Sequence, residues 1–584
     1  MNLRFSPPIR RLLGYFSPYR TQLTGGLLCL FAATLLRLAA PSVLGRALDG
    51  LIGSISNTTL IRYCIILLSL ALGQAVLLFL QRRMLVGVAR DVEYRIRRDF
   101  HTHLQKLPLQ FYQKQRTGDL MARATSDLAS IRMLTGPGLI TTANAVFAPA
   151  LIIPLMCSIN WRLTLLSLIP MPLLLVTTQV FSKRVHEKSR KVQEHYGNLT
   201  SAAQEVLTGM KLLRAYSQER NTAARFKEAS RELVRRNLSL IRLSVVFVPL
   251  LQFFFALGHI AILWYGSYLI LNGRLSIGQF VQITLYLGLI WAPMISFGGV
   301  INQYQRARAS MERIDNILSI QPAIADSGST LDIKDVSGAI EFNNLTFTYK
   351  GAKTPALKDI SLHIAPGQTV AFVGSTGSGK TTLMNLVSRL LDAEAGQVLI
   401  DGRPIQEIPL RVLRRGIGYV PQESSLFSET IAENIAYGVE HDASEIELAA
   451  TMAGLAEDVK EFPEGFETVV GERGVKLSGG QRQRTAIARA LIKRPSILIL
   501  DDALSAVDTH TEERILENLR HVRQGRTSLF VSHRVSTVRD ADLIVVLDDG
   551  RVVEQGTQSE LIARGGLYAS MNARQQLDEE LATC

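Results

Sequence analysis

Hydrophobic positions follow two different patterns along the chain. Up to about residue 318 they gather in six apolar blocks, each near the ~20 residues that a helix needs to cross a bilayer. These blocks lie at Leu23–Leu44, Leu60–Leu80, Gly138–Cys157, Leu163–Val180, Val245–Leu271 and Phe280–Val300. Because backbone polar groups must be paired in lipid, the pattern predicts six membrane-spanning helices. From Ile340 onward, short β-rich runs alternate with helical ones, which is typical of an α/β domain with a mostly parallel sheet.

The change of pattern predicts four segments. Residues 1–20 would hold a short amphipathic helix on the membrane surface, from Ile9 to Tyr19, although a frayed terminus is the alternative. Residues 21–318 would form the helical transmembrane domain. A linker is expected at 319–338, because Gln321–Ser329 contains Pro, Gly and Ser, and residues 339–584 would form the α/β domain.

Charge predicts the orientation of the chain in the membrane. There are 64 Lys and Arg residues against 51 Asp and Glu, a net charge of +13. The basic residues concentrate between the second and third blocks and between the fourth and fifth. The positive-inside rule therefore assigns both segments, both termini and the α/β domain to the cytoplasm. The same surplus would suit a soluble ATPase acting on nucleic acid, but six spans argue against that class and against a nucleic-acid partner.

Composition excludes other classes. A hydrophobic content of 47% rules out a disordered chain. The four cysteines stand alone, so neither a disulfide framework nor a zinc site is expected.

The two basic segments are expected to be helical, because both lack Pro over long stretches and mix charged with apolar residues. Each contains a glycine that predicts a reversal of the chain, Gly118 within Gln115–Asp119 and Gly209 within Leu207–Lys211. A reversal far from the bilayer is a plausible docking point for another domain.

Arg37 is the deepest charged residue in the predicted spans. Ionisable groups at membrane depth usually face a cavity or a partner rather than lipid. Arg37 is therefore a candidate for lining a substrate cavity and hints at an anionic or amphipathic cargo, and the alternative is a structural arginine paired to another helix.

A glycine-rich loop provides the first candidate chemistry. It follows the apolar run Thr369–Val373 and precedes a helical stretch, the strand–loop–helix context that a P-loop requires. Lys380 would reach the β- and γ-phosphates, and the Thr381 hydroxyl would bind Mg²⁺. The predicted ATP-binding residues of the loop are Gly374, Ser375, Thr376, Gly377, Ser378, Gly379, Lys380, Thr381 and Thr382.

A second motif supplies carboxylates. The apolar run Ser496–Leu500 predicts a buried parallel strand, and Asp501 and Asp502 follow it at the edge where ligands bind. Asp501 fits the aspartate that is linked to Mg²⁺, and Asp502 falls where the attacking water would be polarised. A capping role is the alternative for Asp502.

A third motif is a second anion-binding helix start. Ser478, Gly479, Gly480 and Gln481 precede a strongly helical stretch. Because the P-loop already holds one nucleotide, this site would serve the nucleotide of a partner domain.

With these motifs in place, the whole chain resembles an ATP-binding cassette (ABC) half-transporter of the exporter type. The resemblance implies that Tyr349 stacks on adenine, that Gln422 contacts Mg²⁺ and senses the membrane domain, and that His533 contacts the γ-phosphate. It also implies that Gly471–Gly474 is the exporter X-loop and that Ser478–Gln481 is the signature, which contacts the partner's ATP. Ser505–Asp508, with Asp508 at its end, would be the D-loop, and the turns near Gly118 and Gly209 would be coupling helices. The implied cofactors are ATP and Mg²⁺, with Asp502, His533 and Gln422 as catalytic residues and Thr381, Gln422 and Asp501 around the metal.

One position departs from the family pattern, which has glutamate where this chain has Asp502. The shorter side chain would leave its carboxylate ~1 Å from the required place, and such a misplacement can cost on the order of 100-fold in rate. Arg116–Arg123 and Asp501–Asp508 resemble bacterial multidrug-resistance-like half-transporters. The resemblance implies an inner-membrane exporter of an amphipathic small molecule, drug or lipid, paired with a different half-transporter that keeps the glutamate.

Other hypotheses stay open at this point. A homodimer in which Asp502 serves as the base would show brisk ATPase activity without a second protein. An exporter-fold importer has the same motifs. A channel or facilitator that nucleotide merely gates would transport without hydrolysis.

Overall fold

The computed structural model describes residues 7–52, 56–326, 333–471, 477–523, 525–532 and 534–583. Its contacts divide the chain into two compact units. The first comprises Met1–Gln105 and Arg116–Ile320, and the second comprises Lys106–Gln115 and Gln321–Cys584. The first unit is helical and the second is α/β, so the predicted fold class is confirmed.

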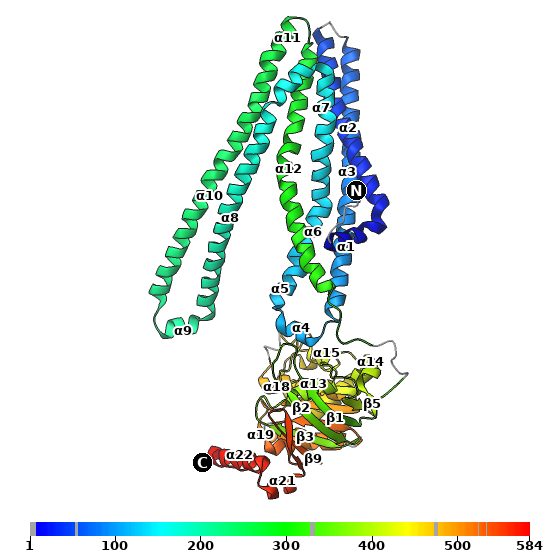
Figure 1. Ribbon diagram of the computed structural model, residues 1–584, viewed down its shortest axis with the longest axis vertical. Coiled ribbons are helices and arrows are strands. Elements are labelled where there is room, and N and C mark those ends of the chain that lie inside the picture. Colours follow the sequence, from blue (N-terminus) through cyan, green and yellow to red (C-terminus); the bar gives the residue numbers. More distant parts are fainter. Residues whose placement is uncertain are drawn as a thin grey trace. The chain divides into compact units, whose positions relative to one another are not determined.

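The first unit consists of long helices joined by short ones (Figure 1). Its α-helices are α1 (Pro7–Phe16), α2 (Arg20–Ile52), α3 (Asn57–Leu104), α5 (Thr117–Ala122), α6 (Leu128–Met133), α7 (Leu139–Leu168), α8 (Pro170–Thr208), α9 (Met210–Ala215), α10 (Glu219–Ala261), α11 (Ser267–Leu271) and α12 (Ile277–Leu318). A 3₁₀ turn η1 (Ser17–Tyr19) follows α1, and three π-helical segments interrupt the longer helices: η2 (Arg123–Asp127), η3 (Leu134–Gly138) and η4 (Ile262–Gly266).

Five helical stretches of the described chain are long and apolar enough to cross a membrane, where the sequence predicts six. The predicted span Leu163–Val180 is not among the five, because it is divided between the end of α7 and the beginning of α8. Inside α7, Asn160 has the extended angles φ −158° and ψ 109°, so the chain bends there. The Asn160 side chain accepts a hydrogen bond from the Leu163 N–H at 3.0 Å and caps the helix that follows. The third and fourth predicted spans therefore lie on either side of Asn160.

The first predicted reversal is displaced along the chain. Helix α3 ends at Leu104 and α5 begins at Thr117, so Gly118 is helical rather than part of a turn. The turn occupies Gln105–Pro108, and the short helix α4 (Leu109–Lys114) follows it. Pro108 explains the shift, because proline disfavours a helical conformation in the residue before it. The second reversal begins at Gly209 as predicted, and α9 lies between α8 and α10.

Helices α8 and α10 pack along one another and are joined by α9. In Figure 1 their α9 end diverges from the group formed by α2, α3, α7 and α12. Within that group, polar contacts join α2 to α12. The buried Tyr286 hydroxyl donates to the Leu38 carbonyl at 2.9 Å, and the Asp49 carboxylate accepts from the Ser276 hydroxyl at 2.6 Å and from the Gly278 N–H at 2.7 Å.

The second unit contains two sheets. Its strands are β1 (Ile340–Phe347), β2 (Leu357–Ile364), β3 (Thr369–Gly374), β4 (Val398–Ile400), β5 (Arg403–Pro404), β6 (Ile417–Val420), β7 (Ile497–Asp501), β8 (Thr527–Val531), β9 (Leu543–Asp548) and β10 (Arg551–Gly556). Besides α4, its helices are α13 (Lys380–Val387), α14 (Leu410–Gly416), α15 (Ile431–Ile435), α16 (Ala443–Met452), α17 (Ala456–Glu461), α18 (Gly479–Ile492), α19 (Thr509–Arg523), α20 (Val535–Val538), α21 (Gln558–Arg564) and α22 (Leu567–Thr583), with 3₁₀ turns η5 (Ile405–Glu407) and η6 (Gly465–Glu467).

The larger sheet has the order β10-β9-β3-β8-β7-β6, and all neighbours in it are parallel except β10 and β9. The smaller sheet, β2-β1-β4-β5, is antiparallel and was not predicted. Strands β3, β7 and β8 are buried along their whole length, as expected of parallel strands covered on both faces. The carboxyl ends of β3, β6, β7 and β8 meet at one edge, and the candidate site lies there.

Candidate nucleotide site

The loop after β3 has a backbone that only glycine allows. Gly374 and Gly379 have φ angles of 148° and 103°, in the region that side chains disfavour. A Cβ on Gly374 would overlap the Leu547 carbonyl, and one on Gly379 would lie 2.6 Å from a Leu357 methyl group. The glycines therefore let the loop turn tightly between β3 and α13, with its backbone close to the place of a ligand.

Lys380 begins α13 and is only 5% exposed. Its ammonium donates to the carbonyls of Gly374 at 2.9 Å and Ser375 at 2.8 Å, and to the Ser378 hydroxyl at 3.3 Å. Burial lowers the pKa of Lys380, and the negative charges of Asp501 and Asp502 oppose this effect. The Lys380 ammonium therefore lies inside the loop, at the place where phosphate oxygens would be bound.

Asp501 ends β7 and is 1% exposed. Its Oδ1 accepts a hydrogen bond from the Thr381 hydroxyl at 3.2 Å, whereas its Oδ2 has no hydrogen-bond partner among the described residues. Burial raises the pKa of Asp501, while the Thr381 hydrogen bond lowers it and the neighbouring Asp502 charge raises it further. A buried carboxylate oxygen without a partner is expensive, and a hard cation is a group that would satisfy it.

A pocket of about 260 Å³ connects these motifs. The predicted residues that line it are Tyr349, Thr376, Gly377, Gly379, Lys380, Thr381, Thr382, Gln422, Asp501 and Asp502. The Tyr349 hydroxyl is 2.9 Å from the Thr382 hydroxyl, and the Tyr349 ring contacts Phe347 edge to face. Gln422 follows β6 and is exposed. The other predicted loop residues, Gly374, Ser375 and Ser378, are not among the described residues that line the pocket, and the Ser375 hydroxyl donates to Asp548 at 3.3 Å.

Asp502 has a left-handed backbone, with φ 51°. Its N–H donates to the Val531 carbonyl at 2.8 Å, and its own carbonyl accepts from the Ser505 hydroxyl at 3.0 Å. Two neighbouring segments, β8 and the D-loop, therefore fix the backbone from which this carboxylate projects into the pocket.

The signature residues lie apart from this pocket, because the described residues lining it include none of them. Ser478 is the N-cap of α18, and a reciprocal capping box joins it to Gln481 with N···O distances of 3.0 and 3.2 Å. A Cβ on Gly480 would lie 3.1 Å from the Ala506 carbonyl, so the D-loop passes close to the helix start. Asp508 is exposed, and the Thr511 N–H that donates to it lowers its pKa.

Two contacts in this region were not predicted from the sequence. Asp458 accepts from Gln481 at 3.1 Å and from Arg484 at 2.8 Å, and so anchors the signature helix. His533 lies outside the described residues, but Arg534 beside it donates to the buried Glu512 at 2.5 Å. In the sequence, only the basic residue directly after the predicted histidine points to this contact. Glu512 itself lies in a polar stretch that resembles a solvent-exposed helix.

Arg37 is in the first unit, exposed on α2, and lines a separate cavity.

Comparison with known families agrees with the two-unit fold. The model "ABC transporter transmembrane region" matches residues 23–294, and the model "ABC transporter" matches residues 357–505. The chain is 37% identical to the "Probable multidrug resistance ABC transporter ATP-binding/permease protein YheI" of Bacillus subtilis (strain 168), over 97% of this chain and 98% of that protein. The chain belongs to the ABC transporter family.

Other relatives of this ABC transporter are consistent with an exporter. It is 34% identical to the "Multidrug resistance-like ATP-binding protein MdlA" of Buchnera aphidicola subsp. Schizaphis graminum (strain Sg), over 98% of this chain and 99% of that one. A bacterial Atm1-family ABC exporter solved with ATP bound has a TM-score of 0.79 at 28% identity, covering 95% of this chain and 99% of its own. This ABC transporter is therefore a multi-span, ATPase-coupled membrane transporter with an exporter fold and an ATP-binding domain, and ABC exporters act as dimers.

Proposed function

We propose that this chain is one half of a heterodimeric exporter, that it carries amphipathic small molecules, drugs or lipids, and that its own P-loop site hydrolyses ATP slowly. The observation that carries this proposal is the pocket residue Asp502, which follows Asp501 where the family has glutamate. An aspartate there leaves its carboxylate ~1 Å short of the attacking water, and the expected loss is on the order of 100-fold.

The fixed backbone of Asp502 disfavours the homodimer alternative. A backbone shift toward the phosphates could compensate for the shorter side chain. Such a shift would break the hydrogen bond to the Val531 carbonyl at 2.8 Å and strain the one from Ser505 at 3.0 Å. Both bonds favour an Asp502 that holds its place without reaching the water.

The signature helix supports a partner with a working site. Ser478 and Gln481 form a complete capping box, and Asp458 holds Gln481 in place. Free backbone N–H groups at the start of α18 would bind the γ-phosphate of the nucleotide on the partner. This chain would then complete an active site whose glutamate and P-loop belong to the other subunit.

The residues present fit Mg²⁺ at the P-loop. The Thr381 hydroxyl and Asp501 lie within 3.2 Å of each other, Asp501 Oδ2 has no partner in the described chain, and Gln422 lines the same pocket. Bound Mg²⁺ would neutralise charge on the β- and γ-phosphates. Thr381, Gln422 and Asp501 would hold it there, and Lys380 would exchange its carbonyl contacts for phosphate oxygens. The predicted role of His533 at the γ-phosphate belongs to the same proposal.

Transport would follow from the difference in ATP affinity between two states of the dimer. ATP would bind more tightly where P-loop and signature face each other, and closure would reach the membrane helices through the chain reversals at Gln105–Arg116 and Gly209–Gln218. The concentration of Lys and Arg between the second and third and between the fourth and fifth predicted spans supports an inner-membrane protein with both termini and the ATP-binding domain in the cytoplasm.

Co-purification from the native membrane tests the heterodimer. We expect a second half-transporter that has glutamate at the position corresponding to Asp502. When the catalytic glutamate of the partner is substituted in that complex, only the site of this chain can hydrolyse ATP. Asp502→Glu should then raise the rate of ATP hydrolysis by up to about 100-fold. Asp549→Glu lengthens an exposed carboxylate outside the pocket and serves as the matched control. Recovery of this chain alone, as dimers with brisk Mg²⁺-dependent ATPase activity that Asp502→Glu leaves unchanged, would contradict the proposal.

A further inference from the structure

A cavity of about 230 Å³ with polar and apolar lining lies within the helical unit, between α2, α7 and α12. All three helices belong to candidate membrane spans. Arg37 contributes the only charge among the described residues that line the cavity. A guanidinium at membrane depth is costly unless a counter-charge or water compensates it.

All three hydroxyl groups among the described residues that line the cavity donate their hydrogen to a backbone carbonyl. Thr34 donates to the Leu30 carbonyl at 2.8 Å, Thr141 to the Pro137 carbonyl at 2.9 Å, and Ser296 to the Pro293 carbonyl at 2.9 Å. These three side chains therefore offer the cavity lone pairs rather than donors.

The donors that the cavity still offers are the N–H groups of Arg37 and the amide of Asn144. Neither side chain forms a hydrogen bond or ion pair with any other residue that the structure describes. A fixed positive charge with an amide donor nearby matches a group rich in oxygen acceptors, because charge-assisted hydrogen bonds to a carboxylate or phosphate are the strong ones.

We propose that this cavity binds the anionic headgroup, a phosphate or carboxylate, of an amphipathic cargo, with Arg37 and Asn144 as donors. The inference rests on the proposed transport function and names the substrate class of that function. The volume supports a headgroup rather than a whole molecule, because pockets for drug-sized ligands enclose ~300–1,000 Å³. The apolar remainder of the cargo would stay among the lipid-facing parts of the spans.

Binding of charge-matched probes to the full assembly in lipid nanodiscs tests the proposal. The probes are dodecyl phosphate, dodecanoate and dodecylphosphocholine, which share a C12 chain and differ in headgroup. We expect one or both anionic probes to bind at least about tenfold more tightly than the phosphocholine, as a hydrogen bond to a charged group predicts. Which of the two anions binds more tightly separates a phosphate from a carboxylate cargo.

Variants identify the residue responsible. Arg37→Gln should remove the preference for anions and leave phosphocholine binding unchanged, whereas Arg37→Lys should keep part of it. Arg62→Gln is the matched control, because it removes an exposed arginine of α3 outside the cavity and should keep the full preference. Asn144→Leu removes the second donor without changing charge and should weaken anion binding several-fold, which keeps the test open if Arg37→Gln does not assemble.

Equal binding of all probes by the wild-type assembly would overturn the inference. It would also be overturned if Arg37→Gln dissociated the subunits while Asn144→Leu kept the full preference, because Arg37 would then be a structural arginine. The Lys380→Ala variant separates the two proposals. If Lys380→Ala stops transport but the wild-type assembly binds all three probes equally, only the headgroup inference fails. If transport continues after Lys380→Ala, the proposed ATP-driven function fails.

Discussion

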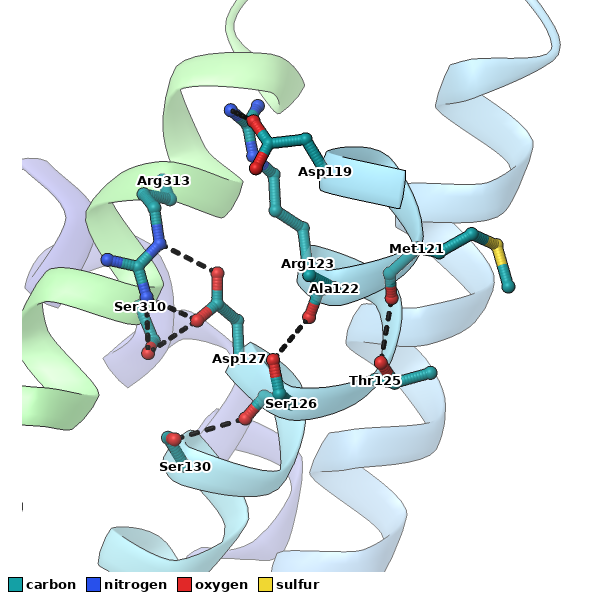
Figure 2. Close-up of polar contacts among 10 residues, drawn as sticks. All are labelled: Asp119, Met121, Ala122, Arg123, Thr125, Ser126, Asp127, Ser130, Ser310 and Arg313. Atoms are coloured by element: carbon teal, nitrogen blue, oxygen red, sulfur yellow. Dashed lines mark hydrogen bonds and ion pairs between the residues drawn. The ribbon is translucent and has the colours of Figure 1, made fainter. Parts of the chain in front are cut away.

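Asp127 and Arg313 form a two-oxygen ion pair between residues 186 positions apart in the chain (Figure 2). Arg313 Nε donates to Asp127 Oδ2 at 2.8 Å, and its second nitrogen contacts Oδ1. The Ser310 hydroxyl also donates to Oδ1 at 2.9 Å. Asp127 ends the π-helical segment η2, and both partners come from α12, so this carboxylate joins the helical segment that precedes α7 to α12.

The two partners of this pair differ in burial, and substitutions should differ accordingly. The Asp127 side chain is 8% exposed and that of Arg313 is 50% exposed. Arg313→Met leaves a buried carboxylate with only Ser310, so we expect it to lower the free energy of unfolding by about 3 kcal/mol. Asp127→Asn leaves an arginine that can reach water and keeps the Ser310 contact, so the loss should be about 1 kcal/mol.

Thermal unfolding of the full assembly in nanodiscs measures this difference. Arg235→Met is a control, because it removes an arginine from an exposed pair on α10 and should change little. A larger loss for Asp127→Asn than for Arg313→Met would contradict the argument from burial.

Asp501 makes a prediction about pH. Burial raises the pKa of Asp501 in the folded protein above the ordinary carboxyl value. Without a bound cation, the free energy of unfolding should therefore fall as pH rises from the ordinary carboxyl pKa to the folded-state pKa, where the side chain ionises. Asp501→Asn should therefore raise the melting temperature of the nucleotide-free protein by a few degrees near pH 7, and this gain should vanish at pH values below the ordinary carboxyl pKa. With Mg²⁺ and ATP present, the wild-type protein should have the higher melting temperature of the two.

Scanning fluorimetry across a pH series checks this expectation, with Asp549→Asn as the exposed control. A wild-type protein that stays more stable than the variant at every pH without nucleotide would count against a buried, unpaired Asp501 oxygen.

The sequence predicts best what depends on neighbouring residues. The P-loop could be predicted because glycines, Lys380 and the strand before them are consecutive, and Asp501 because a buried strand precedes it. Gly118 predicts the first reversal at the wrong place, because Pro108 disfavours a continuing helix and α3 ends before it.

Contacts between distant residues were not predictable in the same way. Asp127 lies in a sequence that resembles an ordinary exposed helix face, and only packing against α12 shows that its carboxylate is buried. The Glu512–Arg534 and Asp458–Gln481 anchors have the same character. Each depends on which helix faces which, and a single sequence does not contain that information.

Tyr349 should contribute to ATP affinity through its ring rather than its hydroxyl. It lines the pocket, and its hydroxyl is held at 2.9 Å from Thr382. Base–aromatic stacking is worth ~1–3 kcal/mol, so Tyr349→Ala should weaken ATP binding about 5- to 150-fold. Tyr349→Phe keeps the ring and should stay within about threefold of the wild type, because it loses one hydrogen bond between neutral groups. Binding of a fluorescent ATP analogue measures both, and equal losses would show that the hydroxyl is what matters.

Lys380 provides the most direct test of coupling between the two units. Its ammonium is buried among Gly374, Ser375 and Ser378, so it is positioned for phosphate before any nucleotide arrives. Lys380→Ala removes this charge, and we expect loss of ATP binding at this site together with loss of ATP-driven flux of a fluorescent amphiphile in proteoliposomes. Lys358→Ala, which breaks only the ion pair with Asp549, should keep both activities. If flux continued at the wild-type rate after Lys380→Ala while nucleotide binding was lost, ATP at this P-loop would not drive the movement of the helices.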